Sequence, residues 1–157
     1  MGVTESGNLH HICYVVKDLR ETARRMAETL AIKPWGVWRI QPQASTLHGR
    51  SAEIAFYVAL AQVGDANYEL IEPISPESVY AEHLESQGEG FHHTCLSYAT
   101  HEALKSAKAE LLSQNREMIQ SGDLGDMGEF CYFDVPDVGV LELLYLSEMP
   151  PPDETIG

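Results

Sequence analysis

The chain has 157 residues and a formal net charge of −14, from 24 acidic and 10 basic residues. This length suits one domain with a hydrophobic core, and the negative charge repels the phosphates of nucleic acids, so we expect no nucleic-acid partner. No apolar run approaches the ~20 residues of a membrane helix, and residues 1–9 lack the features of a signal peptide. We therefore expect a cytoplasmic protein without a membrane partner.

The three cysteines favour the same compartment. Cys13, Cys95 and Cys131 form no CxxC pair, and their odd number suits a reducing environment. The common nucleotide-binding motifs and the HExxH zinc motif are absent.

The chain begins with a strand and a helix. Residues 10–16 read as the strand, and Asp18 is a good N-cap for a helix whose apolar residues repeat at helical spacing as far as Ile32. Pro34 then ends the helix. Residues 41–49 are polar and rich in turn formers, so they predict a loop.

Two strands and a short helix follow. Residues 54–61 and 67–71 are predicted strands joined by a turn at 64–65. Ser75 and Pro76 are typical of a helix start, and we expect this linking helix to span 75–87.

The order of elements then starts again. Residues 91–98 predict a strand, and Thr100 caps a helix. The later elements are a strand at 116–120, a glycine-rich loop at 122–129, and strands at 130–134 and 140–146. The proline-rich segment 148–157 predicts a mobile tail.

The two halves of the chain therefore carry one pattern twice: a strand, a helix and three more strands. The segment LHHICY at 9–14 matches FHHTCL at 91–96, and YELI at 68–71 matches LELL at 141–144. A repeat of this kind says more about architecture than any single motif. We predict a single α+β domain over 1–157 with two βαβββ modules, at about 9–72 and 91–147.

The repeated segments also carry the candidate metal ligands. Side chains alternate between the two faces of a strand, so His11 and His93 lie on the faces that point away from the predicted helices. Glu69 and Glu142 are acids within otherwise apolar strands. Because the four residues occupy equivalent places in two modules, we expect them to converge on one divalent ion.

Two imidazoles and two carboxylates suit cobalt, nickel, manganese, zinc or iron. Around an octahedral ion they leave two positions for water or substrate, and the ion acts as a Lewis acid on a carbonyl or enolate oxygen. A single His or Glu on a strand is more often a structural or solvated residue, and the matched pairs are what favour ligands. His10 and His92 are the alternatives if the strand faces are reversed.

The stretches HHICYVVKDL, YELIEPISPES, ESQGEGFHHTCLSY and GVLELLYLSE resemble the vicinal oxygen chelate (glyoxalase/bleomycin resistance/dioxygenase) superfamily. Within it they look most like methylmalonyl-CoA epimerases. The resemblance implies a cupped mixed sheet, a homodimer, and metal ligands at His11, Glu69, His93 and Glu142. It also implies a metal-dependent isomerase or epimerase that acts through an enolate of a small-molecule acyl thioester.

In that reading Glu142 shuttles the proton and Glu69 is its pseudo-symmetric partner, while Glu53 is the candidate for a further acid/base. The alternatives are a glyoxalase-like isomerase or lyase acting on a small carbonyl or cyclic compound, or a metal-free protein that sequesters a ligand. A ring-cleaving dioxygenase fits less well, because it needs two His and one carboxylate.

Three further features stay open. The acidity of the chain disfavours a coenzyme A ester. Trp35 and Trp38 are either ligand contacts or plain core, and the apolar segment 35–40 that contains them also suggests the dimer interface. The loop 122–129 is either a lid or a set of turns.

Overall fold

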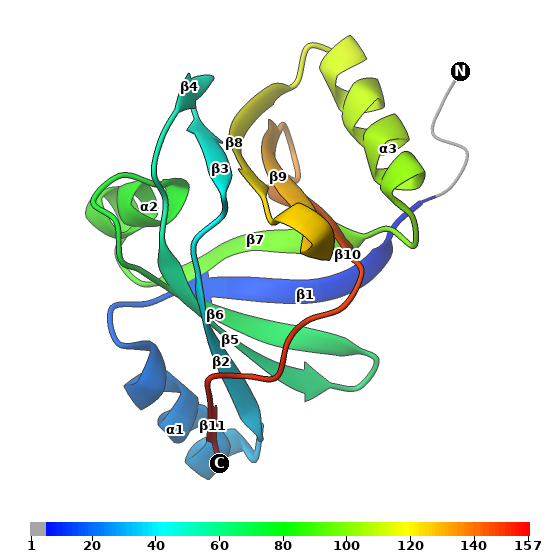
Figure 1. Cartoon of the computed structure of the whole chain (residues 1–157). Coiled ribbons are helices and arrows are strands. Elements are labelled where there is room, and N and C mark those ends of the chain that lie inside the picture. Colours follow the sequence, from blue (N-terminus) through cyan, green and yellow to red (C-terminus); the bar gives the residue numbers. More distant parts are fainter. Residues whose placement is uncertain (1–5) are drawn as a thin grey trace.

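The computed structural model describes residues 6–157, so five of the residues considered above for a signal peptide lie outside it. The strands are β1 (Asn8–Val15), β2 (Trp35–Ile40), β3 (Ala44–Leu47), β4 (Arg50–Ser51), β5 (Phe56–Val63), β6 (Ala66–Pro73), β7 (Gly90–Ser97), β8 (Glu117–Asp123), β9 (Gly128–Val135), β10 (Gly139–Leu146) and β11 (Glu154–Ile156). The helices are α1 (Leu19–Leu30), α2 (Val79–Gln87), α3 (His101–Ser113) and the short 3₁₀ helix η1 (Gly125–Met127) (Figure 1).

All strands join one mixed sheet in the order β11-β2-β5-β6-β1-β7-β10-β9-β8-β3-β4. Within the sheet the same four-strand arrangement occurs twice, as β1-β6-β5-β2 and as β7-β10-β9-β8. In each copy the strands that come first and last in sequence lie side by side and run parallel. The two βαβββ modules and the α+β class predicted from the repeat are confirmed.

The modules meet where β1 pairs with β7 in antiparallel fashion. His11 lies opposite Cys95, and Cys13 lies opposite His93, so the two copies of the repeat are related by a local two-fold axis. The register shifts once between Leu9 and His11 and once opposite His92. Each repeat therefore has one bulge, and the bulged residue is the histidine before the predicted ligand.

The prediction of a loop at 41–49 is wrong, because this region contains β3, which pairs with β8 of the other module. The Thr46 Oγ1 and Ser121 Oγ atoms are 2.7 Å apart, and Leu47 is buried. The segment is polar because it lies at the end of the sheet, next to the two-residue edge strand β4, where one face meets water. This strand closes the first module onto the second.

The C-terminal segment forms β11 along β2 instead of a mobile tail. The Trp38 Nε1–H donates to the Pro150 carbonyl at 2.9 Å, and the Asp153 amide donates to the Val37 carbonyl at 2.8 Å. These bonds anchor the segment to an edge strand that would otherwise expose its backbone. In Figure 1 this red segment runs from β10 across the molecule to β2.

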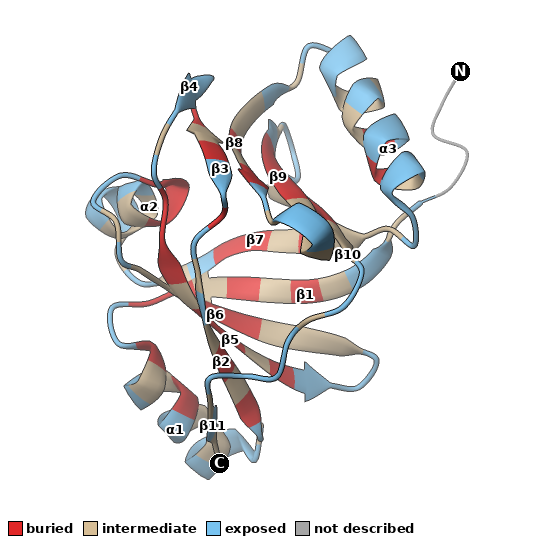
Figure 2. Ribbon diagram, in the orientation of Figure 1, coloured by how far each residue is buried: buried red, intermediate tan, exposed pale blue. Residues whose placement is uncertain are grey.

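Helices α1 and α3 cover the outer face of the sheet. The Asp18 and Thr100 side chains cap them, as predicted, by accepting from backbone amides three residues ahead. Under α1, the fully buried Trp35 packs with Leu19 and Ala23, so this tryptophan is core. Figure 2 shows buried residues on the central strands and on the sheet-facing sides of these helices.

Helix α2 begins later than predicted. Its cap is Ser78, whose Oγ accepts from the Ala81 amide at 3.0 Å, while the Ser75 hydroxyl accepts from the Ala55 amide. The helix inserts the fully buried Tyr80 into the interior core of the cup. Within residues 6–157, no helix is long and apolar enough to cross a membrane.

Candidate metal centre

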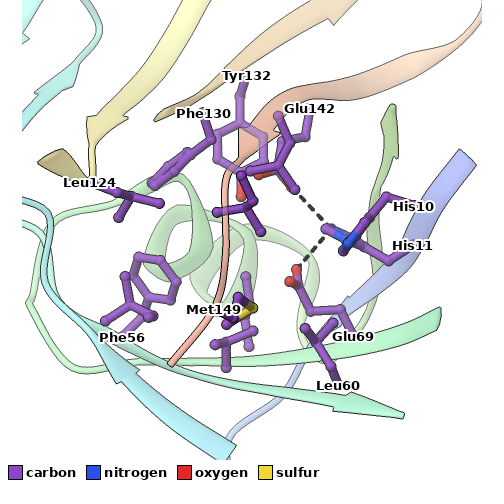
Figure 3. Close-up of a pocket in the computed structure, with 15 residues that line it drawn as sticks. His10, His11, Phe56, Leu60, Glu69, Leu124, Phe130, Tyr132, Glu142 and Met149 are labelled. Atoms are coloured by element: carbon purple, nitrogen blue, oxygen red, sulfur yellow. Dashed lines mark hydrogen bonds and ion pairs between the residues drawn. The ribbon is translucent and has the colours of Figure 1, made fainter. Parts of the chain in front are cut away.

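The two predicted ligands of the first module meet at the centre of the cup. The Nε2 atom of His11 lies 3.1 Å from Oε1 of Glu69. Both residues are buried, at 2% and 7% exposure. Figure 3 shows the Glu69 carboxylate and the His11 ring pointing toward each other from neighbouring strands.

The two ligands of the second module complete the cluster. Oε1 of Glu142 lies 3.0 Å from Nε2 of His11 and 3.0 Å from Nε2 of His93. The two imidazole nitrogens are 3.2 Å apart. One ligand atom from each of the four residues lies within 4.8 Å of the other three. We call these residues (His11, Glu69, His93 and Glu142) the four-residue cluster.

The strand register explains the convergence. In the first module Glu69 pairs with Cys13, and in the second Glu142 pairs with Cys95. The cysteines lie two residues after the cluster histidines, so each glutamate shares a face with the histidine of its own module. The antiparallel pairing of β1 with β7 brings these two faces together.

The bulges determine what the other ring nitrogens contact. Nδ1 of His10 lies 2.7 Å from Nδ1 of His11, and Nδ1 of His92 lies 2.8 Å from Nδ1 of His93. A bulge re-aims a side chain that strict alternation would send to the opposite face. Each cluster histidine therefore faces the cluster with Nε2 and a neighbouring histidine with Nδ1.

The cluster carries strong electrostatic coupling. Burial lowers the pKa of His11, but the Glu69 and Glu142 carboxylates outweigh burial and raise it well above its ordinary value. Burial raises the pKa of both glutamates, and their contacts with His11 and His93 outweigh it and hold the pKa of each below the usual range. Both carboxylates are therefore ionised at neutral pH.

The neighbouring histidines behave in the opposite way. Burial, and then the proximity of His93 and His83, lowers the pKa of His92 to about 3. Burial, and then the proximity of His11, lowers the pKa of His10. Both side chains are neutral at pH 7, so their Nδ1 atoms are available to accept a hydrogen bond from the cluster histidines.

The four-residue cluster fits a divalent cation. Among residues 6–157, Oε1 of Glu69 is a buried oxygen with no hydrogen-bond donor, although it faces the imidazoles. Such an oxygen carries a large desolvation penalty unless a positive charge balances it. Two imidazole nitrogens and two carboxylates are ligands for first-row metals, and the contact of each Nδ1 with another histidine is the support that metal-bound histidines need.

A pocket of about 60 Å³ opens beside the cluster. His10, His11, Glu69 and Glu142 lie in its wall, and the remaining lining residues are apolar or aromatic. They are Ile40, Phe56, Val58, Leu60, Ile71, Leu124, Phe130, Tyr132, Leu144, Leu146 and Met149. Figure 3 shows Leu124, Phe130, Phe56 and Met149 on one side of the two carboxylates, with His10 and His11 on the other side.

The other predicted site residues have different positions. Glu53 is exposed, in the segment between β4 and β5, and is not part of the pocket lining. Neither Trp35 nor Trp38 lines the pocket. Within the loop 122–129, Leu124 does line it, which brings this loop to the rim.

Three lining residues have no clear sequence signal. Met149 lies in the segment predicted to be mobile, and strict alternation sends His10 to the opposite face. Tyr132 packs its ring 4.8 Å from that of His93, and its hydroxyl lies 2.7 Å from the Tyr80 hydroxyl. The repeat gives no hint of it, because Tyr132 lies opposite Glu142, whereas the residue opposite Glu69 in the first module is Leu60.

Comparisons with known proteins identify the family and the fold of the chain. The model of the Glyoxalase/Bleomycin resistance protein/Dioxygenase superfamily matches residues 10–133, a range that includes His11, Glu69 and His93 and stops before Glu142. No curated protein matches the chain.

Several solved structures share the fold. A hypothetical protein from Bacillus halodurans C-125 has a TM-score of 0.64 at 21% identity, covering 93% of this chain and 99% of that one. Methylmalonyl-CoA epimerase from Mycobacterium tuberculosis has a TM-score of 0.62 at 19% identity, covering 94% of each chain. A Streptomyces coelicolor methylmalonyl-CoA epimerase in complex with 2-nitronate-propionyl-CoA has a TM-score of 0.62 at 16% identity, covering 92% of this chain and all of that one.

At these identities the solved structures establish the fold alone, whereas the family model covers most of the chain. The protein belongs to the Glyoxalase/Bleomycin resistance protein/Dioxygenase superfamily, the vicinal oxygen chelate proteins.

Proposed function

We propose that this protein is a divalent-metal-dependent isomerase that moves a proton next to a carbonyl group, in the manner of a methylmalonyl-CoA epimerase. The observation that carries the proposal is the four-residue cluster, in which two imidazole nitrogens and two carboxylates lie within 4.8 Å of one another. Three of its residues, His11, Glu69 and Glu142, line a pocket. The metal is cobalt, nickel, manganese, zinc or iron by ligand type.

A bound ion would supply a Lewis acid that stabilises the negative charge developing on a substrate oxygen. The protein's own part is to hold and move the proton. Glu142 is ionised and lies in the pocket wall, so its carboxylate is the proposed base. Glu69 faces the pocket from the other module and is the proposed partner on the opposite side.

The exposed position of Glu53 gives its acid/base role no support from geometry. We propose an acid/base role for Glu53 from the family resemblance alone. Glu142 and Glu69 are the acid/base pair that the pocket favours.

A second candidate is a glyoxalase-like isomerase or a lyase acting on a small carbonyl or cyclic compound. The apolar lining of the pocket and the net charge of −14 favour it over a polyanionic thioester. A metal-free sequestering protein is the third candidate, and the buried carboxylates of Glu69 and Glu142 disfavour it, because an apolar ligand does not compensate their charge.

Assembly and location belong to the proposal as well. A homodimer is supported by the resemblance, but Trp35 and Trp38 are both engaged within the chain and so no longer point to an interface. The buried free thiols of Cys13, Cys95 and Cys131 support a cytoplasmic location.

The test is proton exchange in deuterated water with metal-loaded protein. Methylmalonyl-CoA, 2-hydroxy-ketones and cyclic ketones are incubated separately, and deuterium incorporation is followed by mass spectrometry. Exchange of the thioester alone supports the epimerase, and exchange of the small carbonyl compounds alone supports the second candidate. Absence of exchange in the whole panel would reject the isomerase.

A further inference from the structure

The wall of the pocket comes from both modules and is apolar on both sides. Phe56, Val58 and Leu60 line it from β5. Phe130 lies opposite on β9, and Leu144 and Leu146 lie on β10. These strands present alternate residues to the pocket, so their backbone groups are used in the sheet and offer little to a ligand.

Charge complementarity to an anion is absent from this wall. Within the described part of the chain, no Lys, Arg, Ser, Thr, Asn or Gln side chain lines the pocket. The Tyr132 hydroxyl is engaged with that of Tyr80. A carboxylate or phosphate on a substituent that lies against this wall, away from the metal position, would find no Lys or Arg side chain of the described lining to pair with it.

The pocket is also small. Its volume of about 60 Å³ leaves room for only a few water molecules. A short alkyl group or a small ring is the kind of substituent that gains from such a wall, because its transfer from water buries apolar surface without losing hydrogen bonds.

We infer that the substrate of this site carries a compact, uncharged apolar group beside its metal-binding oxygens, and no second carboxylate within the pocket. This inference rests on the proposed function and narrows its substrate class. The dicarboxylic acyl group of methylmalonyl-CoA is disfavoured, and a monofunctional carbonyl compound with an apolar substituent is favoured.

Hydroxamates test the inference, because they chelate a divalent ion through two adjacent oxygens and allow the substituent to vary. Acetohydroxamate, butanohydroxamate and succinic monohydroxamate are titrated by calorimetry into zinc-loaded protein. Affinity is expected to rise about three- to fourfold for each methylene buried. Butanohydroxamate should then bind at least about tenfold more tightly than succinic monohydroxamate, which replaces its terminal methyl with a carboxylate. Equal affinities, or a preference for the succinic compound, would overturn the inference.

A variant that adds a positive charge to the pocket wall tests the inference in the opposite direction. Leu60→Lys places a flexible cation in the wall at a partly exposed position, and should reverse the preference in favour of the succinic compound. Val138→Lys is the matched control, because Val138 is 58% exposed and lies outside the pocket lining. Circular dichroism and thermal unfolding confirm that both variants fold. An unchanged preference in folded Leu60→Lys would also contradict the inference.

Failure of the metal site is distinguishable from failure of this inference. If the wild-type protein takes up no zinc, the proposed function fails. The same butano and succinic pair is then titrated against metal-free protein, and the methyl resonances of Leu60, Leu144 and Met149 are followed. If only butanohydroxamate shifts these resonances, the inference that the pocket takes an apolar group stands. Equal shifts with both compounds, or no shift with either, reject that inference.

Discussion

Nδ1 of His92 lies 2.8 Å from Nδ1 of His93, and the first module repeats this contact between His10 and His11 at 2.7 Å. Because His92 is neutral, it can accept the Nδ1–H of His93. That arrangement leaves the lone pair of His93 on Nε2, the atom that faces the cluster. The bulged histidines therefore set the tautomer that a metal ligand requires.

Removing this support should weaken metal binding without abolishing it. His92→Ala is expected to reduce metal affinity about 10- to 100-fold, the usual effect of losing such a partner. The affinity is measured by competition with a chromophoric chelator. His101→Ala is the control, since His101 is exposed, contacts Glu129 and the Tyr145 ring, and lies outside the pocket lining. Equal affinities of the two variants would show that the Nδ1 contact has no positioning role.

The cluster histidines themselves should be indispensable. Purified protein is expected to bind close to one divalent ion per chain, measured by elemental analysis after dialysis. His11→Ala and His93→Ala should each lose it, because each removes one of four ligands. Full occupancy in both variants would refute the assignment, and loss in His10→Ala and His92→Ala instead would transfer the ligand role to those residues.

Glu142→Gln separates metal binding from proton transfer. The amide oxygen can still coordinate an ion, but the amide cannot act as a base. The exchange rate should fall ~10²–10⁴-fold, while part of the metal is retained. Glu102→Gln, an exposed residue in the first turn of α3, is the control. A Glu142→Gln variant that keeps its metal and exchanges at the wild-type rate would exclude Glu142 as the base.

The raised pKa of His11 predicts how pH affects the metal-free protein. A histidine whose pKa is raised on folding stabilises the folded state fully at pH values below its ordinary pKa of 6.5. This stabilisation is lost as the pH rises toward and through the pKa of the folded state. Above about pH 7.5 and below the raised pKa of His11, the free energy of unfolding should fall by at most about 1.4 kcal/mol per pH unit.

The neighbouring His10 and His92 do not obscure this slope. Folding lowers the pKa values of both histidines, so both are already neutral in the folded state at these pH values. Their contribution to the free energy of unfolding stops changing with pH once the same histidines have also lost their protons in the unfolded chain, near the ordinary histidine pKa. Urea unfolding at several pH values measures the slope. His11→Gln should flatten it, and a slope that persists in this variant would assign it to another group. Metal uptake near pH 7 should release a proton, seen by calorimetry in two buffers.

The C-terminal segment should contribute to stability. Deleting residues 148–157 removes the pairing of β11 with β2 and three further hydrogen bonds, made by the Trp38 side chain, the Asp153 amide and the Arg39 amide. Each contributes ~0.5–1.5 kcal/mol, so the melting temperature should fall and the β2 amides should exchange faster with deuterated water. Unchanged protection of β2 in the truncated protein would mean that β11 is not formed in solution.

The sequence predicts the strand faces and the core well where the signal is local. Alternation places His11, Cys13 and Val15 on one face, and the helix caps at Asp18 and Thr100 follow from side-chain chemistry. The repeat adds the architecture, because two matched modules leave few ways to join their sheets.

The rest depends on pairings between distant parts of the chain. The bulge at His10 exists only because β1 pairs with β7 in that register, so alternation alone sends this side chain to the wrong face. The strand β3 reads as a loop because it is polar and pairs with β8, far away in sequence. The strand β11 reads as a tail because it is a short edge strand after three prolines, and its partner β2 is also distant in sequence. Ser75 resembles a cap as strongly as Ser78, and only the bond to Ala55 decides between them.

The four-residue cluster draws His11 and Glu69 from one module and His93 and Glu142 from the other. An ion held there would be a cross-link between the two halves of the chain, made only in the native state. An ion that binds only the native state, at a free concentration 100 times its dissociation constant, stabilises the folded state by about 2.7 kcal/mol. A chelator would then loosen the whole fold as well as empty the site, and cells short of the metal would lose the protein to proteolysis along with its activity.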